Sequence, residues 1–87
     1  MRSKNKPAMT AQERRHVDRV AQLDCVVCGD SPVEVHEFEQ GQWFTAVPVC
    51  TPCHRGSDGY HGTRLRWKLR KMDEMKAINE TIRRLEV

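Results

Sequence analysis

Four cysteines form two close pairs in this sequence, Cys25-x-x-Cys28 and Cys50-x-x-Cys53, with residues 29–49 between them. Two such pairs can place four thiolates at the corners of a tetrahedron, about 2.3 Å from a zinc ion. Structural zinc is therefore the preferred interpretation, with two disulfides or four free thiols as the alternatives. Only 38% of the 87 residues are hydrophobic, so the core is small and a metal site would stabilise much of the fold.

Three of the four histidines, His36, His54 and His61, lie between the cysteine pairs or soon after the second pair. A group of imidazoles suits a second metal ion that keeps an open position for water or phosphate. A single histidine is more often an ordinary polar residue, so the prediction depends on these three acting together with Glu37. His16 is expected to be solvated on the first helix and is left out of the site.

The charged residues separate along the chain, although the formal net charge is only +3. Residues 25–50 contain four acidic residues and no Lys or Arg, whereas the segments on both sides are basic. An acidic centre between basic segments suits a protein whose centre binds a cation and whose flanks bind the phosphates of a polyanion. The same pattern is equally typical of solvated helices on either side of a hairpin. No apolar run approaches the ~20 residues of a membrane span and no signal peptide is recognisable, so we expect a cytoplasmic protein without membrane contact.

A strongly basic run extends from Arg64 to Lys71, with five cations in eight residues and no acid. On a helix, Arg64, Lys68 and Lys71 share one face, which suits contact with DNA phosphates. The alternative is a solvated helix whose long side chains cover the edge of the core. Trp67 is expected to pack inside the protein rather than stack on a base.

Capping signals and hydrophobic periodicity predict the elements that must position these residues. Residues 1–9 are expected to form a flexible basic arm, and residues 10–87 a single domain. Thr10 and Glu13 fit a capping box, in which each side chain accepts a hydrogen bond from the other residue's amide. The capping box predicts a helix that starts at residue 11 and extends to about residue 23.

The remaining elements are a predicted hairpin and two predicted helices. Alternating polarity indicates strands over residues 33–38 and 43–47, and Pro48 is expected to end the second strand. After Gly62 the apolar residues fall on two different helical faces, which a helix break at Asp73 would reconcile because Asp caps helices. The first face contains Leu65, Leu69 and Met72, and the second contains Met75, Ile78, Ile82 and Leu85. These elements together predict a small α+β fold.

The chain resembles the HNH (ββα-metal, His-Me finger) nucleases in the pair His36-Glu37, in residues 45–50, and in Cys53-His54. More narrowly, residues 17–28 and the later segment Gly59-Tyr60-His61-Gly62 are similar to phage recombination-enhancement (Ref-type) nucleases. The resemblance covers residues 11–87. It implies a zinc-braced ββα-metal core with helices at both ends, in a phage protein that acts in a bacterial host cell.

The resemblance also implies a role for individual residues of this sequence. His36, together with His54, His61 or both, would bind a catalytic divalent metal ion such as Mg²⁺, Mn²⁺ or Zn²⁺. Thr45 stands where the family usually has the middle Asn, which orients the loop or the substrate. Glu37 stands where the family usually has the histidine that activates water.

The function implied by the resemblance is metal-dependent hydrolysis of DNA phosphodiesters, with Glu37 deprotonating the attacking water. An unperturbed Glu has a pKa of about 4.3 and is a weak base at pH 7, so a slow nuclease or an inactive DNA-binding descendant are the alternatives. Ref-type nucleases are associated with recombinase filaments on DNA, so the resemblance also implies such a filament as a partner. The competing class is a non-catalytic zinc module that binds DNA or a host protein as a regulator. Zinc-dependent dimerisation through Ile78, Ile82 and Leu85 is compatible with either class.

Overall fold

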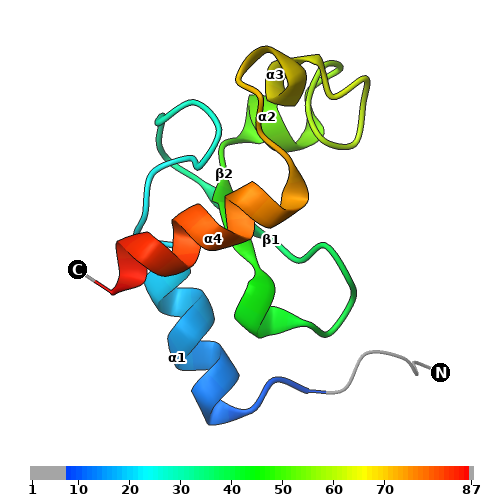
Figure 1. Cartoon of the computed structure of the whole chain (residues 1–87). Helices are drawn as coiled ribbons and strands as arrows, with labels where there is room; N and C mark the ends of the chain where they lie inside the picture. Colours follow the sequence, from blue (N-terminus) through cyan, green and yellow to red (C-terminus); the bar gives the residue numbers. More distant parts are fainter. Residues whose placement is uncertain (1–7, 87) are drawn as a thin grey trace, which may run out of the picture.

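The computed structural model describes residues 8–86, so residues 1–7 of the predicted arm lie outside the described part of the chain. The described residues form five helical segments and a two-stranded antiparallel sheet, which confirms a small α+β fold (Figure 1). In chain order the elements are α1 (Ala11–Val20), β1 (Glu34–His36), the 3₁₀ helix η1 (Trp43–Thr45), β2 (Val47–Val49), α2 (Thr51–Arg55), α3 (Leu65–Leu69) and α4 (Glu74–Leu85).

The hairpin differs from its prediction in the second strand. Residues 43–45 form a 3₁₀ helix, and the strand lies over Val47–Val49 with Pro48 at its centre, paired with Val35. The carbonyl of Pro48 accepts a hydrogen bond from the amide of Val26 at 2.9 Å, so the backbone polar groups of Pro48 face away from β1. The missing N–H of proline therefore removes no bond between the two strands, and the prediction that Pro48 ends the strand is wrong.

Helix α1 starts as its capping box predicts and ends earlier than expected. The Glu13 amide donates to Thr10 Oγ1 at 3.1 Å and the Thr10 amide donates to Glu13 Oε1 at 2.8 Å. The helix ends at Val20, and the amide of Leu23 then bonds the carbonyl of Val20 in a tighter turn that leads into the first cysteine pair.

His16 is not the solvated residue that the sequence predicts. Its ring lies 5.2 Å from the ring of Phe44, measured between centroids, and its Nε2 atom is buried without a hydrogen-bond partner among the described residues. Burial, together with nearby Arg19, lowers the pKa of His16. His16 thus helps α1 pack against η1.

The chain after α2 divides into two helices at the predicted position. Asp73 caps α4 by accepting a hydrogen bond from the Lys76 amide at 2.8 Å, and Lys71 just before it has a positive φ of 54°. The predicted core stripe is wrong at Leu65 and Leu69, which are 47% and 74% exposed, whereas its third member, Met72, is partly buried against the core. Trp67 is buried in their place, as expected of a packed tryptophan, since one indole covers more area than either leucine.

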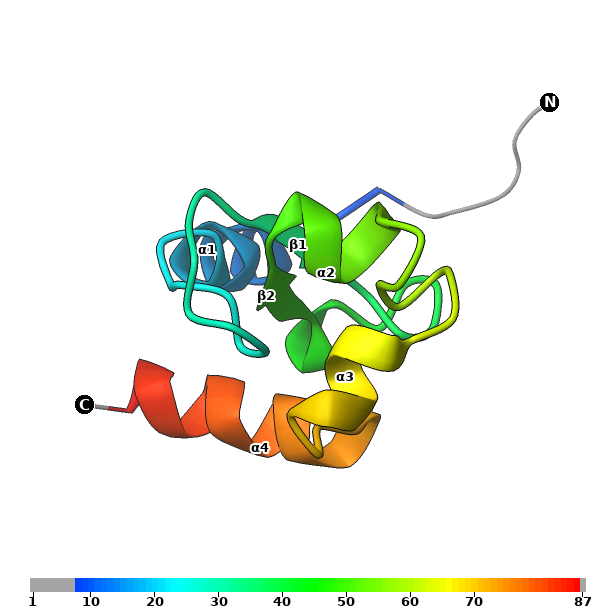
Figure 2. The same ribbon diagram turned by 90° about the horizontal axis from the view of Figure 1, so that it is seen from above.

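The most deeply buried side chains of helix α4 are small, and Ile78 of its predicted apolar face is partly buried against the core. Ala77 and Thr81, one turn apart, are fully buried, and the Thr81 hydroxyl donates to the Ala77 carbonyl at 2.7 Å. Their small size lets α4 approach β2 and α1, and α4 lies along one side of the sheet (Figure 2). Met75 and Ile82 consequently remain 74% and 38% exposed, contrary to the prediction that they enter the core.

Replacing Asp73 with Ala should lower the free energy of unfolding by about 1 kcal/mol, because the Lys76 amide loses its acceptor at the first turn of α4. Urea denaturation followed by circular dichroism measures the change. Asp73→Asn keeps an acceptor oxygen and should retain most of the stability. An Asp73→Ala variant as stable as the parent chain would show that the cap does not support the helix break.

Candidate metal centres

The four cysteine sulfurs converge at one point in the fold. Cys25 and Cys28 lie in the turn after α1, while Cys50 caps α2 and Cys53 lies within that helix. Their sulfur atoms all lie within 4.8 Å of one another, and those of Cys28 and Cys50 are 3.5 Å apart. Four sulfurs at 2.3 Å from a central zinc would be about 3.8 Å from one another. The four cysteines are free thiols, and their arrangement fits a zinc-binding module that holds a structural metal.

The first cysteine turn is shaped by its backbone. Gly29 has a φ of 86°, a conformation that side chains disfavour, and its amide donates to the Cys25 carbonyl at 2.9 Å. The amides of Val27 and Cys28 point at the Cys25 sulfur, at 3.4 and 3.5 Å. Such N–H groups stabilise a thiolate, the form of cysteine that binds metal.

Electrostatics in this sulfur cluster favour a bound cation. Burial raises the pKa of Cys28 to about 11 and raises the pKa of Cys53 as well, because a thiolate in an apolar site is poorly solvated. A divalent metal ion reverses this cost, since it deprotonates the thiols that coordinate it. The cysteine chemistry and the sulfur geometry therefore lead to the same assignment.

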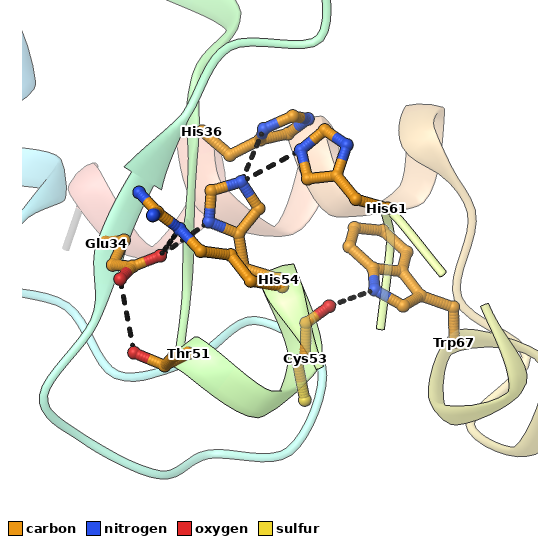
Figure 3. Close-up of polar contacts among 8 residues, drawn as sticks. Glu34, His36, Thr51, Cys53, His54, His61 and Trp67 are labelled. Atoms are coloured by element: carbon orange, nitrogen blue, oxygen red, sulfur yellow. Dashed lines mark hydrogen bonds and ion pairs between the residues drawn. The ribbon is translucent and has the colours of Figure 1, made fainter. Parts of the chain in front are cut away.

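A second convergent group consists of His36, His54 and His61. The Nε2 atom of His54 lies 3.0 Å from Nδ1 of His36 and 3.2 Å from Nε2 of His61, as Figure 3 shows. Imidazole nitrogens bound tetrahedrally to a zinc-sized ion would be about 3.3 Å apart. His36 and His54 are buried whereas His61 is exposed, so the group opens to solvent on one side.

Helix α2 and the loop after it bring these three histidines together. His36 ends β1, and His54 follows Cys53 directly in α2. The loop then folds back on the helix: the Tyr60 amide donates to the Cys53 carbonyl at 2.8 Å, and the His61 amide donates to the His54 carbonyl at 3.1 Å. Gly59 makes this return feasible, because a Cβ there would lie 2.5 Å from the carbonyl oxygen of Pro52.

Glu34 orients the central histidine and was not among the residues predicted from the sequence. Its carboxylate accepts a hydrogen bond from Nδ1 of His54 at 2.6 Å and further bonds from Arg55 and Thr51 (Figure 3). A proton on Nδ1 leaves the lone pair of Nε2 directed at His36 and His61. A sequence signal existed, because Glu34 and His36 are two residues apart in a strand and therefore share a face.

Aromatic side chains surround the His36 ring. Tyr60 and Phe38 lie 4.7 and 4.9 Å from it, measured between ring centroids. Burial, followed by the neighbouring His54 and His61, lowers the pKa of His36 to about 4, so this imidazole is neutral at pH 7. The Tyr60 hydroxyl donates to Glu74 in the first turn of α4, which connects the wall of the histidine cluster to that helix.

Thr45 and Glu37, to which the family resemblance gives a role in the site, do not belong to the cluster of histidine nitrogens. The Thr45 hydroxyl donates to the Gln42 carbonyl at 3.0 Å and closes the turn of η1. The carboxylate of Glu37 does not belong to the group of ligand atoms within 4.8 Å of one another, although its charge acts on neighbouring His36 and favours its protonated form. Glu37 is thus a neighbour of the histidine cluster rather than a member of it.

The predicted basic face is not a face of one helix. Helix α3 covers only Leu65–Leu69, so Lys68 lies in it whereas Arg64 precedes it and Lys71 follows it. Arg64 has a φ of 64°, and its guanidinium stacks 3.9 Å from the Tyr60 ring centre while Nε donates to the Tyr60 carbonyl. Arg64 therefore lies beside the histidine cluster, held by a residue of its wall.

Neither a family model nor a curated protein nor a solved structure matches this chain. The resemblance to HNH nucleases therefore rests on the motif residues of the sequence alone. None of the helices in the described part of the chain combines the length and apolar character needed to cross a lipid bilayer.

The folded chain should contain about one zinc ion per molecule, bound by the four cysteines. Such sites contribute about 10–16 kcal/mol, as much as the whole stability of a small domain, so chelation or Cys50→Ser should unfold the chain. Metal analysis combined with circular dichroism measures both effects, and returning zinc to the chelated wild-type chain should restore its helical signal. Folded protein that carries no metal would refute the assignment.

Proposed function

We propose that this protein is a metal-dependent DNA endonuclease of the HNH type. The observation that carries the proposal is the convergence of three imidazole nitrogens from β1, α2 and the following loop, with one exposed member. Three protein ligands with an open fourth position are characteristic of catalytic rather than structural metal sites. The carboxylate of Glu34 behind His54 supports this interpretation, because metal-binding histidines commonly donate their other N–H to such a group.

A divalent cation at these nitrogens would supply positive charge to a phosphate and to the oxygen that leaves it. Glu37, beside His36 in sequence, would accept the proton of the attacking water. Arg55 on α2 and Arg64 beside Tyr60 carry positive charge close to the histidines and would bind neighbouring phosphates of the DNA backbone. In this mechanism the two arginines hold the substrate, and Glu37 moves the proton.

A second candidate function is a zinc module that binds DNA or a protein without cutting. The observation that favours it is the Thr45 hydroxyl, which stands where the family has its Asn and donates to the Gln42 carbonyl within η1. A glutamate at position 37 is also a weaker base at pH 7 than the family's histidine. Cleavage assays separate the two functions, because both predict a zinc-dependent fold and only the first predicts a metal-dependent product.

The chain should nick or cut DNA in the presence of Mg²⁺, Mn²⁺ or Zn²⁺, and His61→Ala should remove this activity. His61 is exposed, so its loss should leave the zinc-supported fold intact while deleting a ligand on the open side of the cluster. A plasmid-relaxation assay with a metal series, extended to single-stranded and branched DNA, measures the effect. His16→Ala serves as the control, because His16 packs against Phe44 outside the cluster. Cleavage by His61→Ala at the parental rate would exclude the proposed site.

Replacing Glu34 or Glu37 with glutamine should affect two different properties, metal affinity in the first case and cleavage rate in the second. Glu34→Gln should weaken divalent-metal affinity by about 10–100-fold, because His54 loses its charged hydrogen-bond partner. Glu37→Gln should leave metal affinity unchanged and slow cleavage by about 10²–10⁴-fold, the usual contribution of a general base.

Calorimetric metal titration and single-turnover cleavage measure the two quantities separately. Glu39→Gln, an exposed acid of the same connection, is the matched control and should alter neither. Full cleavage activity in Glu37→Gln would remove Glu37 from the mechanism, and unchanged metal affinity in Glu34→Gln would contradict its role behind His54.

A further inference from the structure

An apolar groove of about 950 Å³ lies between α4, the residues just before it and Val26 of the first cysteine turn, and its lining contains none of the three histidines. Its apolar lining comes from Val26, Met72, Met75, Ile78 and Ile82. Met75 is 74% exposed and Ile82 is 38% exposed, although both are large apolar residues. A contiguous apolar surface of this kind on a small protein typically marks an interaction site, and methionine adapts readily to different partners.

The fold leaves part of this surface open because the most deeply buried residues of α4, Ala77 and Thr81, lie on another face. Ile78 is partly buried against the core, whereas Met75 and Ile82 are exposed, and these three residues follow one another at intervals of three and four. That spacing places the three side chains in one row along the helix. A row of this length matches the apolar side of a second helix that lies along α4.

The rim of the groove is positively charged. Arg70, Lys71 and Lys76 line one end, and none of them forms an ion pair with another residue of the described range. The acid of the groove, Glu80, is already bound by Arg84 at 2.8 Å and by Arg83. A ligand in this groove therefore meets an apolar floor and a row of cations that have no acidic partner.

We propose that this groove binds an acidic, amphipathic helix of a partner protein. Acidic side chains on the edges of that helix would pair with the cationic rim, and its apolar stripe would cover Met75 and Ile82. A second copy of the chain fits less well, because its groove carries the same positive rim. The chain's own residues 1–7 also fit poorly, because they contain Arg2, Lys4 and Lys6 and no acid. The proposal is independent of the metal chemistry at the histidine cluster.

The test uses the full zinc-loaded chain and a synthetic helical peptide of about 16 residues, with leucines in one stripe and glutamates on the other faces. Fluorescence anisotropy measures affinity, and the NMR methyl signals of Met72 and Met75 report where the peptide binds. Two control peptides accompany it: one with the same composition in scrambled order, and one with lysine in place of glutamate. The acidic amphipathic peptide should shift the Met75 methyl signal and bind more weakly as salt is raised.

Variants of the chain assign the binding to the groove. Met75→Gln and Ile82→Gln should each weaken peptide binding by about tenfold, the loss expected for one buried apolar side chain. Leu69→Gln is the matched control, because Leu69 is also 74% exposed and lies outside the groove. Lys76→Glu should weaken binding and flatten its salt dependence, whereas Arg15→Glu on α1 should not.

The outcomes that overturn the proposal are distinct from one another. Equal binding of the scrambled or lysine peptide would show that neither the stripe nor the charge is recognised. No Met75 shift at millimolar peptide would show that the groove has no affinity for such a helix. Sedimentation that reveals a dimer of the chain, abolished by Ile82→Gln, would assign the groove to a second copy instead. Because His61→Ala should bind the peptide as the parent does, a failed nuclease assay leaves this result unaffected.

Discussion

The carbonyl oxygen of Cys53 accepts two hydrogen bonds, from the Tyr60 amide at 2.8 Å and from the Trp67 indole at 2.9 Å. The first bond turns the glycine-rich loop back onto α2 and places His61 beside His54. The second attaches α3 to α2 and buries the largest side chain of the chain's second half. The sulfur of Cys53 belongs to the cysteine group, and its backbone carbonyl holds the loop and the helix that lie beside the histidine group.

This arrangement makes α2 the element on which the cysteine group and the histidine group both depend. Cys53 contributes to one group and His54 to the other, and a helix of five residues cannot move one without moving its neighbour. The buried hydrophobic residues are few and mostly small, with Val, Ala and Cys predominating over larger side chains. A core of this kind provides limited stabilisation, so a metal bound by the cysteines would also determine how well the histidine nitrogens converge.

The proposed catalytic surface and the proposed docking groove use different parts of the fold. The histidines, Glu34 and Arg64 gather around β1, α2 and the loop after it, whereas the groove follows α4. The helix break at Asp73 separates the two, because α3 anchors to α2 through Trp67 and α4 is free to pack against β2 and α1. A protein with these two surfaces could cut a nucleic acid while bound to a partner protein.

Local features of this fold were predictable from the sequence wherever neighbouring residues decide them. The capping box of Thr10 and Glu13 and the break at Asp73 depend on side chains that bond backbone groups three residues away, so their patterns are visible in the chain itself. The two cysteine pairs and the three histidines were predictable for a related reason, because only a few residue types bind metal well. These predictions needed no knowledge of distant packing.

Tertiary packing decided which apolar residues became the core and which polar residues supported the histidines. Leu65, Leu69, Met75 and Ile82 have the periodicity of buried residues, yet Trp67, Ala77 and Thr81 pack inside because they fit the space beside α2 and β2. Hydrophobic periodicity shows that a helix has an apolar face, but close packing selects side chains by shape, which depends on the partner element. Pro48 fits within its strand because an N–H group at this position would point away from β1. The pairing register of the two strands determines that direction.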